Sequence, residues 1–253
     1  MTFSSLLDLN KAQLLSLAPE EVDWILTSKE IFHMADLLGA YWQYDYAALD
    51  RGIPGYHAQL KSGLCSDGFF NAKALLAHNN LRRIIASQMV MKLDAVRRSV
   101  QPKGPLPGYV FGIPDAASKL AEDVADILGL PLVKLVKNEG RIAVEGEVPA
   151  DKTGLPVEDI CTKGTGFREG VCCLLDAQPR TLIYPHELLI LNRGGLSVIE
   201  VRGKCYATAA LVDERMNEWE YPCTALCKRG SIRIKPKETE ENWRLITTAQ
   251  KVA

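Results

Sequence analysis

The stretch that decides the fold reads Val157-Glu158-Asp159-Ile160-Cys161-Thr162-Lys163-Gly164-Thr165-Gly166. Two adjacent carboxylates come first, and a turn rich in glycine and hydroxyl groups follows them directly. After the turn, apolar residues recur at helical spacing, beginning with Phe167 and Val171. The order of strand, acidic pair, turn and helix is typical of a strand-to-helix connection in an α/β fold.

The chemistry of this stretch suits a sugar phosphate. A pair of carboxylates at a strand end, here Glu158 and Asp159, can hydrogen-bond vicinal sugar hydroxyls. The turn supplies backbone N–H groups, two hydroxyls and an ammonium at the start of a helix, which is where a phosphate is best held. A Gly-rich turn can also be a plain connector, but the acidic pair before it favours a ribose 5-phosphate site. The residues that would bind the 5-phosphate are Thr162, Lys163, Gly164, Thr165 and Gly166.

Length, composition and charge restrict the class of protein. The chain has 253 residues, 47% hydrophobic and 24% charged, which suits one α/β domain with appendages or two small domains. The net charge of −1 provides no basic field for nucleic acid or an anionic membrane, so we expect neither as a partner. No apolar run approaches the ~20 residues that span a bilayer. The first residues lack the segments of a secretory signal.

The cysteines indicate a reducing compartment. There are seven at irregular spacing, which is unlike a disulfide framework and predicts a cytoplasmic protein. Cys223 and Cys227 form a Cys-x-x-x-Cys pair, but no second pair of ligands follows at matching spacing. We therefore interpret them as reduced thiols and predict no protein-held metal, with a zinc-stapled interaction protein as the alternative. The histidines show no ligand spacing and are interpreted as structural or surface residues: His33, His57, His78 and His186.

The chain divides into three parts. Residues 1–55 carry helical patterns, and residues 214–253 form a tail rich in charge, Pro and Cys that we expect to pack on the core. Residues 56–213 form the predicted core, in which short apolar strands alternate with helices from about Tyr109. This alternation implies a mostly parallel sheet with helices on both faces. Ligands of such sheets bind beyond the carboxyl ends of the strands, where the acidic pair and the turn around Asp115 fall. Asp115 can also cap the helix after it.

Four further stretches are similar to segments of one enzyme family. They are Leu60-Lys-Ser-Gly-Leu-Cys-Ser-Asp-Gly-Phe-Phe-Asn-Ala-Lys73, Gly112-Ile-Pro-Asp-Ala-Ala-Ser-Lys-Leu-Ala121, Leu191-Asn-Arg-Gly-Gly195 and Pro222-Cys-Thr-Ala-Leu-Cys-Lys-Arg-Gly-Ser-Ile-Arg-Ile-Lys-Pro-Lys237. Together with the acidic pair and its turn, they resemble the orotate phosphoribosyltransferases, which are type I phosphoribosyltransferases. The resemblance covers residues 55–237 of the chain.

This resemblance implies a fold, a reaction and a set of roles. The fold is an α/β fold with a Rossmann-like, mostly parallel sheet flanked by helices and a small hood formed by N- and C-terminal segments. The reaction transfers ribose 5-phosphate from phosphoribosyl pyrophosphate (PRPP) to a nucleobase, most simply orotate. It uses Mg²⁺ bound largely by the ligand's own oxygens, in a homodimer. The catalytic residues would be Asp159, Glu158 and Arg141. Pyrophosphate would be bound by Ile113, Pro114, Asp115 and Lys137, and the base by Lys61, Phe69, Phe70 and Arg193.

The chain departs from the family pattern in three places. A long loop with a Lys and a His usually follows the strand that here ends near Lys137, but this chain passes almost directly into the next strand. Asn138 replaces a usual Lys, and Arg141 could supply the missing positive charge. Leu64 stands where Arg is common, and Pro156 interrupts the strand before the acidic pair, which a central strand tolerates only at a bulge or an unpaired N–H. Two alternatives follow: transfer to another base, or a non-catalytic module that senses PRPP or a nucleotide.

Overall fold

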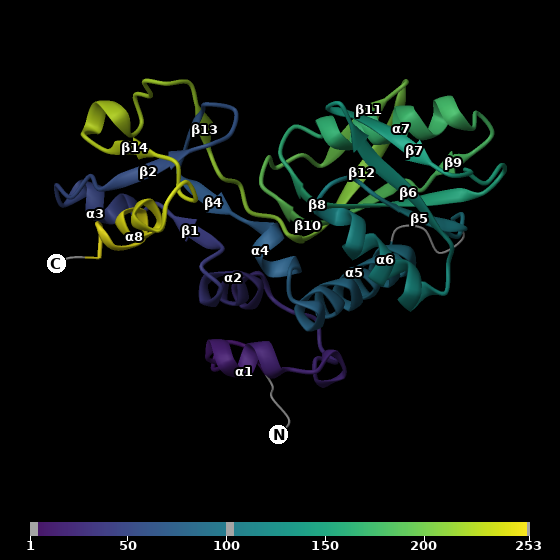
Figure 1. The fold of residues 1–253 in the computed structure, drawn as a ribbon, viewed down its shortest axis with the longest axis horizontal. Coiled ribbons are helices and arrows are strands. Elements are labelled where there is room, and N and C mark those ends of the chain that lie inside the picture. Colours follow the sequence, from purple (N-terminus) through teal and green to yellow (C-terminus); the bar gives the residue numbers. More distant parts are fainter. Residues whose placement is uncertain (1–4, 100–103, 252–253) are drawn as a thin grey trace. The chain divides into compact units, whose positions relative to one another are not determined.

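The computed structural model describes residues 5–99 and 104–251. The chain forms two units, and each is built from separate stretches of sequence (Figure 1). The first unit contains Met1–Met34 and Ala72–Arg215, and the second contains Ala35–Asn71 and Met216–Ala253. The predicted tail therefore shares a unit with the segment that precedes Ala72. Within the described ranges, no helix is both long enough and apolar enough to cross a membrane.

A mostly parallel sheet forms the centre of the first unit. Its strands are β5 (Tyr109–Gly112), β6 (Leu132–Asn138), β7 (Arg141–Glu145), β8 (Thr153–Cys161), β9 (Leu182–Ile183), β10 (His186–Asn192), β11 (Val198–Val201) and β12 (Lys204–Val212). They lie in the order β11-β12-β10-β8-β5-β6-β7, with β9 beside β8. The central neighbours are parallel, and the edge pairs β11–β12 and β6–β7 are antiparallel. This confirms the α/β class predicted from the alternation of strands and helices.

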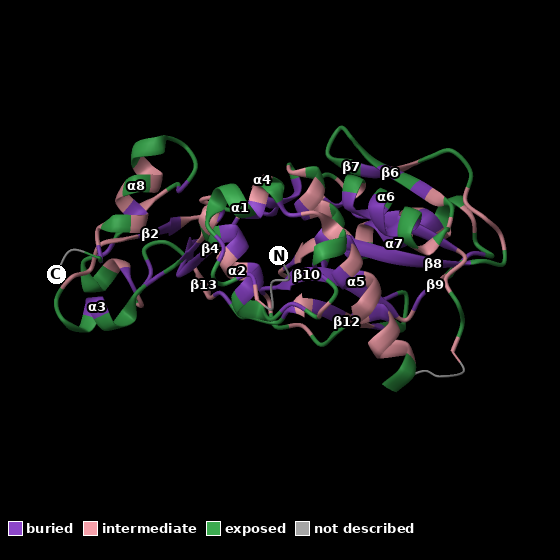
Figure 2. Cartoon of the chain, turned by 90° about the horizontal axis from the view of Figure 1, so that it is seen from below, coloured by how far each residue is buried: buried purple, intermediate pink, exposed green. Residues whose placement is uncertain are grey.

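Helices cover both faces of this sheet. One face is covered by α5 (Asn79–Ser99) and α6 (Ala117–Leu128), and the other by α7 (Thr165–Ala177) (Figure 1). Phe167, Val171 and Leu174 of α7 are fully buried, as their helical spacing predicts. Burial of each such side chain contributes about 1.5–3 kcal/mol. β10 is buried along its whole length (Figure 2), which is expected for a strand covered on both faces.

The N-terminal part of the first unit is helical, as its sequence pattern predicts. It contains α1 (Lys11–Ser16), the 3-10 turn η1 (Pro19–Glu21) and the start of α2 (Ser28–Leu37). The short helix α4 (Ala72–Leu76) leads from the second unit back into α5. Asn80 in α5 donates to the carbonyl oxygens of Leu14, Leu15 and Leu17 at 3.0 to 3.2 Å. The two hydrogens of this amide are thus shared among carbonyl groups at the end of α1, where intrahelical donors run out.

Pro156 has no backbone N–H, and it lies at a point of β8 where no neighbouring strand would accept a hydrogen bond from one. Gly154 O accepts from Tyr184 N on the β9 side of β8, and Val157 O accepts from Ile113 N on the β5 side. The backbone N–H and C=O groups of successive residues in β8 therefore point to opposite neighbouring strands. The backbone nitrogen of Pro156 points to the same side as the backbone groups of Gly154. On that side, β9 pairs with β8 as far as Gly154, and β10 pairs from Val157 onward. The proline thus occupies the break between two pairing partners.

The second unit combines segments from both halves of the chain. The first segment supplies β1 (Tyr41–Gln43), α3 (Tyr46–Asp50), β2 (Tyr56–Gln59), β3 (Cys65–Ser66) and β4 (Gly68–Phe70). The second supplies β13 (Glu218–Trp219), η2 (Cys227–Arg229), β14 (Ile232–Ile234) and α8 (Glu240–Thr248). One sheet has the order β13-β3-β2-β14, and β1 pairs with β4. The C-terminal strands therefore flank β2 and β3 on both edges, so that the predicted tail is part of a sheet.

A buried carboxylate joins the two segments of the second unit. Asp67 is 1% exposed, and its Oδ1 accepts from Asn217 N at 2.8 Å. Its Oδ2 accepts from Asn217 Nδ2 at 2.8 Å and from the Tyr46 hydroxyl at 2.9 Å. Burying a charge is costly unless its oxygens are satisfied, and here three donors satisfy them. Asp67 therefore has a structural role within the segment that resembles the base-binding signature.

Candidate functional site

The turn after β8 leads into α7 at the carboxyl edge of the sheet. β8 ends at Cys161, α7 begins at Thr165, and Gly164 occupies the N-cap position with φ of 66°. Helical hydrogen bonding starts with Arg168 N donating to Gly164 O at 3.1 Å. The N–H groups of the first helical turn have no intrahelical partner, and the helix dipole adds partial positive charge there. The residues assigned to a phosphate from the sequence, Thr162–Gly166, thus surround a helix N-terminus that favours an anion.

The turn after β10 packs directly against this phosphate turn. Arg193 N and Gly194 N both donate to Cys161 O, at 3.0 and 3.1 Å. A Cβ atom on Gly194 would overlap the carbonyl oxygen of Thr162, so glycine alone permits this approach. The two turns meet because β8 and β10 are parallel neighbours whose carboxyl ends share one edge. The predicted Asn-Arg-Gly-Gly turn therefore supports the phosphate turn through backbone contacts.

The two carboxylates of the acidic pair point to opposite faces of the sheet, as successive strand residues do. Glu158 is 7% exposed and lies on the α7 side, where a Cβ atom on Gly166 would be 2.8 Å from its Oε1. Asp159 is only partly buried. Asp159 is therefore the member of the pair that a bound sugar can reach more readily.

Glu158 faces an acidic residue that the sequence did not single out. Glu187 lies on β10, two residues before Leu189, which is the register partner of Glu158, so both carboxyls point to the same face. One oxygen of each carboxyl and Cys161 Sγ lie within 4.8 Å of one another. Within the described residues, no donor outside the pair satisfies Glu158 Oε2 or either Glu187 oxygen, so the two carboxyls have each other as hydrogen-bond partners. The one sequence signal for Glu187 is its position as an acidic residue directly before the apolar run 188–191.

Burial controls the protonation of this carboxyl pair. Loss of hydration and, less strongly, the charge of Asp159 raise the pKa of Glu158 from 4.5 to about 7, although a hydrogen bond with Glu187 lowers it. Loss of hydration and the neighbouring Glu158 charge raise the pKa of Glu187 well above 4.5. Two carboxyls in one dry site are most stable when they share a proton. The pair therefore holds at least one proton near neutral pH.

A lysine that the sequence did not single out lies beside the turn around Asp115. Lys73 Nζ is 3.8 Å from Asp115 Oδ2, and both side chains are more than half exposed. Burial raises the pKa of Asp159, while the Lys73 charge lowers it and the Asp115 charge raises it. The three residues thus share one electrostatic environment at the ends of the adjacent strands β5 and β8. Asp115 does not cap α6 as expected, because the N-cap is Ala116 and no side chain caps the helix.

The other residues of this turn contribute mainly backbone. Ile113 N donates to Val157 O at 2.9 Å, and the Ile113 side chain is 3% exposed. It packs against α7, where a Cβ atom on Gly170 would lie 2.7 Å from Ile113 Cδ1. The Pro114–Asp115 peptide bond is cis, Pro114 is half-buried and Asp115 is exposed. Any contact of Ile113 with a ligand would therefore be through its backbone.

The predicted short connection after Lys137 is a tight β-hairpin. β6 pairs with β7, with Asn138 opposite Arg141. Glu139 and Gly140 form a two-residue turn with φ of 48° and 84°, as in a type I′ turn. Ile142 N donates to Glu169 Oε1 at 2.8 Å and so ties the hairpin to α7. Lys137 and Arg141 are exposed, and neither forms an ion pair in the described part of the chain.

The predicted base-binding residues are divided between the units. Lys61 is exposed in the β2–β3 turn of the second unit. Phe69 packs on Trp243 with ring centroids 5.9 Å apart, and Phe70 is 5% exposed. Arg193 belongs to the first unit and is largely buried. Side chains alternate between the two faces of β4, so Phe69 is half-exposed and Phe70 points inward.

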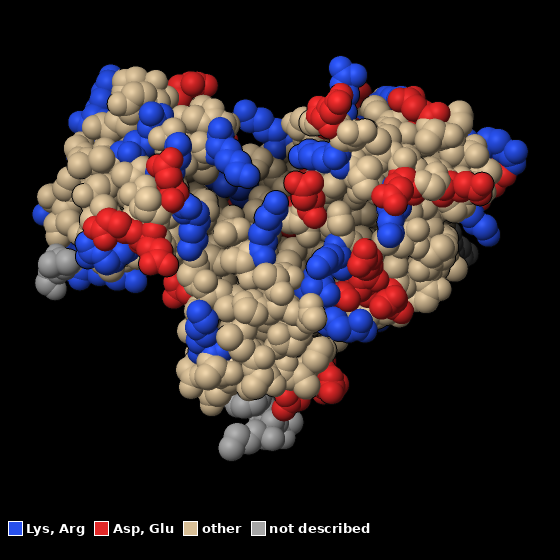
Figure 3. Space-filling model, in the orientation of Figure 1, with Lys and Arg blue, Asp and Glu red and all other residues tan. Residues whose placement is uncertain are grey.

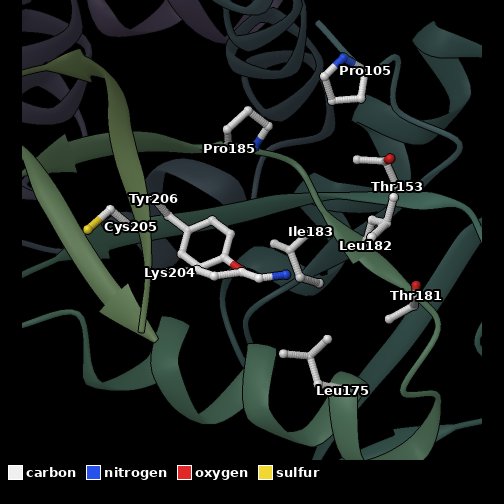
Figure 4. Close-up of a pocket in the computed structure, with 10 residues that line it drawn as sticks. All are labelled: Pro105, Thr153, Leu175, Thr181, Leu182, Ile183, Pro185, Lys204, Cys205 and Tyr206. Atoms are coloured by element: carbon white, nitrogen blue, oxygen red, sulfur yellow. The ribbon is translucent and has the colours of Figure 1, made fainter. Parts of the chain in front are cut away.

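Charges of both signs are mixed on the face in Figure 3, and the pocket in Figure 4 lies away from the phosphate turn. Lys and Arg are interspersed with Asp and Glu on the face in Figure 3, in agreement with the net charge of −1. The pocket in Figure 4 has a volume of about 490 Å³ and a mostly apolar lining that includes Lys204. It lies at the amino ends of the strands, since Thr153 begins β8 and Pro185 precedes β10. The phosphate turn is at the opposite, carboxyl edge.

Comparison with known proteins supports the resemblance. No family model matches the chain. A curated orotate phosphoribosyltransferase from Caenorhabditis elegans is 32% identical to it over 114 residues, which cover 44% of this chain and 47% of that protein. The match thus spans about half the length of this relative.

Solved structures with a similar arrangement include two orotate phosphoribosyltransferases. The protein from Aeropyrum pernix has 19% identity and a TM-score of 0.48, with 72% of this chain and 92% of that chain covered. The protein from Mycobacterium tuberculosis H37Rv has 16% identity and a TM-score of 0.48, with 71% and 93% covered. Leishmania donovani UMP synthase has 18% identity and a TM-score of 0.46, with 70% and 36% covered.

The sequence match, the order of the motifs and the sheet agree with one another. Two of the motifs, the phosphate turn and the turn around Asp115, lie at the carboxyl ends of the neighbouring strands β8 and β5. The sheet between the helices is mostly parallel, which is the arrangement that the alternation of strands and helices predicts. The chain is therefore similar to an orotate phosphoribosyltransferase over 44% of its length, and its own fold is an α/β fold with a mostly parallel sheet between helices.

Proposed function

We propose that this chain is a glycosyltransferase that transfers ribose 5-phosphate from PRPP to a nucleobase. Orotate is the first candidate, with orotidine 5-phosphate and pyrophosphate as products, because the matched relative is an orotate phosphoribosyltransferase. The observation that carries the proposal is the convergence of three features at one edge of one sheet. These are the phosphate turn before α7, Asp159 at the end of β8, and Lys73 beside Asp115 after β5. PRPP requires an anion site, a hydroxyl acceptor and a second cationic site.

The 5-phosphate would bind at Thr162–Gly166. The N–H groups at the start of α7 point along the helix axis toward this turn and would donate to phosphate oxygens. Arg168 Nη1 donates to Lys163 O at 2.5 Å, and its Nε donates to Glu200 O at 3.2 Å. This arginine fixes the turn and adds positive charge beside it. Lys163 is exposed and would meet the phosphate as a point charge.

Asp159 would hold the ribose hydroxyls and stabilise the reacting sugar. Displacement of pyrophosphate from C1 develops positive charge on the ribose ring, which a carboxylate fixed near it stabilises. The alternation of β8 favours a different role for Glu158, which lies under the turn with Glu187 and supports its shape. Arg141 would add positive charge near the leaving group, as the sequence suggests. The catalysis is thus mainly positioning and electrostatics.

Pyrophosphate would be met by the backbone of Ile113–Asp115 and by Lys73 and Lys137. The Asp115 and Asp159 carboxylates are oxygen donors of the type that Mg²⁺ prefers, which fits an ion bound mainly through the oxygens of PRPP. When bound, Mg²⁺ neutralises charge on the departing pyrophosphate. Lys73 Nζ, 3.8 Å from Asp115, would exchange that partner for a pyrophosphate oxygen.

The base would be bound by the residues that the family resemblance assigns: Lys61, Phe69, Phe70 and Arg193. Cationic side chains suit the carboxylate of orotate, and an aromatic face such as Phe69 suits a planar ring. A homodimer is proposed on the same resemblance. Leu64, which replaces a common Arg, makes another nucleobase the nearest alternative acceptor.

A PRPP-sensing role without turnover is the second candidate. The observation that favours it is the tight β6–β7 hairpin, which leaves Arg141 as the cation in place of a long loop. Without such a loop, water would reach a developing oxocarbenium ion more easily. PRPP binding without product formation would distinguish this role from the enzymatic one.

The test is a direct assay with Mg²⁺, PRPP and orotate. Orotate absorbance is followed together with pyrophosphate release, and a reaction without PRPP is the control. Loss of orotate with stoichiometric pyrophosphate supports the proposed enzyme. Parallel assays with uracil, adenine and guanine identify another acceptor. No product with any base, but PRPP binding by calorimetry, favours the sensor; absence of PRPP binding would refute both roles.

A further inference from the structure

Four potential metal ligands converge in the second unit, outside the phosphate site. His57 lies on β2, Cys65 lies on β3, Cys223 precedes η2, and Cys227 is the first residue of η2. One ligand atom from each lies within 4.8 Å of the others. His57 and Cys227 are 170 residues apart, so tertiary structure brings the set together. This explains why the Cys-x-x-x-Cys pair shows no second ligand pair nearby in the sequence.

The distances between these atoms match the edges of a tetrahedral zinc site. Sγ of Cys227 is 3.7 Å from Sγ of Cys65, 3.4 Å from Sγ of Cys223 and 3.5 Å from Nε2 of His57. With Zn–S of about 2.3 Å and Zn–N of about 2.05 Å, a tetrahedron places two sulfurs about 3.8 Å apart and a sulfur and nitrogen about 3.5 Å apart. The separations therefore suit one ion at the centre.

The His57 ring is oriented so that Nε2 faces the sulfurs. Its Nδ1 lies 3.0 Å from Ser231 Oγ, and Ser231 Oγ donates to Gly55 O at 3.4 Å. A hydroxyl whose proton is used in this way accepts from the ring, so Nδ1 carries the proton and the lone pair of Nε2 points at the cluster. Metal-binding histidines are commonly oriented by such a partner on the other nitrogen.

The surroundings of the thiols suit a closed site. Cys227 N donates to Cys223 Sγ at 3.4 Å, and an N–H donor stabilises the negative charge of a thiolate. His57 and Cys65 are fully buried, and Cys223 is 2% exposed. Four protein ligands complete a tetrahedron and leave no position for water or substrate, which is typical of a structural zinc site. Core packing alone explains the burial but not the convergence of three sulfurs on an imidazole nitrogen.

We propose that the second unit binds one Zn²⁺ through His57 Nε2 and the sulfurs of Cys65, Cys223 and Cys227. Soft thiolates with an imidazole in a tetrahedron select zinc over Mg²⁺ or Ca²⁺, which prefer oxygen. On binding, each thiol loses its proton to solvent and its sulfur forms a bond to the ion. The loaded site holds three thiolates and a neutral imidazole, and no group is oxidised or reduced.

The ion would fasten the two segments of the second unit to each other. The β2–β3 hairpin supplies two ligands, and the C-terminal segment supplies the other two. Small units with a limited core gain much of their stability from such a metal. Lys61 lies in the turn between the ligands His57 and Cys65, so zinc would also restrain this exposed lysine. The zinc site does not depend on the proposed transferase activity.

Metal analysis of untagged wild-type protein is the first test. We expect one zinc per chain by plasma mass spectrometry. Exchange with Co²⁺ should produce the visible absorption of a tetrahedral, thiolate-bound cobalt. Cys227→Ser and His57→Asn should each lose stoichiometric zinc and this spectrum. Cys205→Ser is the matched control, because Cys205 is an exposed cysteine of β12 and should leave the zinc content unchanged.

A titration of the wild-type protein keeps the test decisive if a variant fails to fold. A mercurial thiol reagent should release one zinc as the thiols of Cys65, Cys223 and Cys227 are modified. Wild-type protein that contains no zinc, and takes up none on dialysis against zinc, would overturn the proposal. The proposal would also be overturned if the folded Cys227→Ser and His57→Asn proteins each retained one equivalent of zinc.

Discussion

Glu158 and Asp159 are adjacent in the sequence, but the alternation of a strand separates their chemistry. Glu158 turns inward to meet Glu187, while Asp159 shares the environment of Lys73 and Asp115. An acidic pair in a motif therefore does not imply two equivalent carboxylates. Each member requires its own test.

Asp159→Asn should leave the fold intact and lower turnover. The amide keeps the shape of the side chain but loses the charge that would stabilise the reacting ribose, so we expect kcat to fall by at least about 100-fold. Orotate consumption at saturating PRPP measures the effect, and thermal unfolding checks the fold. Asp126→Asn, at an exposed residue of α6, is the matched control. Unchanged kinetics in Asp159→Asn would contradict the role of Asp159.

The Glu158–Glu187 pair predicts a pH-dependent stability. Both folded-state pKa values lie above the ordinary 4.5, and that of Glu158 is about 7. The folded protein then binds more protons than the unfolded chain, so the free energy of unfolding should fall as pH rises from about 5 to about 8. Glu187→Gln should flatten this dependence, because the amide cannot become a second buried charge.

Urea unfolding across this pH range measures the dependence for the wild-type and Glu187→Gln proteins. Glu200→Gln, at an exposed residue of β11, should follow the wild type. Parallel curves for wild type and Glu187→Gln would show that the pair does not titrate in this range.

Among the elements, the connections between strands and helices carry the site. The turns after β8 and β10 are held together by two N–H groups on one carbonyl and by the missing side chain of Gly194. The hairpin β6–β7 is shorter than the family pattern, as the sequence predicts. These connections are short and are anchored to buried strands, so their geometry follows from the sheet.

Gly194→Ala should weaken PRPP binding and destabilise the first unit. Its Cβ atom would overlap Thr162 O, and relief of the clash must move the phosphate turn, at a cost of about 1–3 kcal/mol. Calorimetry with PRPP and urea unfolding measure the two effects. Gly203→Ala is the control. A Cβ atom on Gly203 would meet no atom within 4 Å, and φ is 74°, so this change strains the backbone without displacing the phosphate turn. Equal PRPP affinity in the wild-type and Gly194→Ala proteins would contradict the role of this contact.

At the scale of the whole molecule, each unit has its own proposed ligand. The first unit contains the phosphate turn, and the second contains the cluster of His57 with three cysteines. Both units are assembled from stretches that are distant in the sequence. Their stabilities should therefore respond to different additions.

Mg²⁺–PRPP should raise the melting temperature of the chain, and a zinc-selective chelator should lower it. A ligand at 100 times its Kd stabilises the folded state by about 2.7 kcal/mol. Scanning calorimetry with each addition alone and with both measures the effects, which should add if the sites are independent. Failure of PRPP to stabilise the chain argues against the phosphate site, and insensitivity to the chelator argues against the zinc site.

The sequence by itself determined the parallel α/β fold and the strand–turn–helix around Thr162–Gly166. These features are encoded locally, in strand and helix periods, glycines and an acidic pair. It also indicated the short connection before Arg141, because the residues between the two strands can be counted.

Only the tertiary structure decided which distant side chains meet. The partner of Glu158 lies on another strand, Lys73 reaches Asp115 from helix α4, and His57 and Cys65 join Cys223 and Cys227. The division into two units that each combine separate stretches is also a tertiary result. Local periodicity shows which face of an element is buried, but not which residue of another element packs there. That depends on strand order and register, which are set by burial and hydrogen bonding over the whole chain.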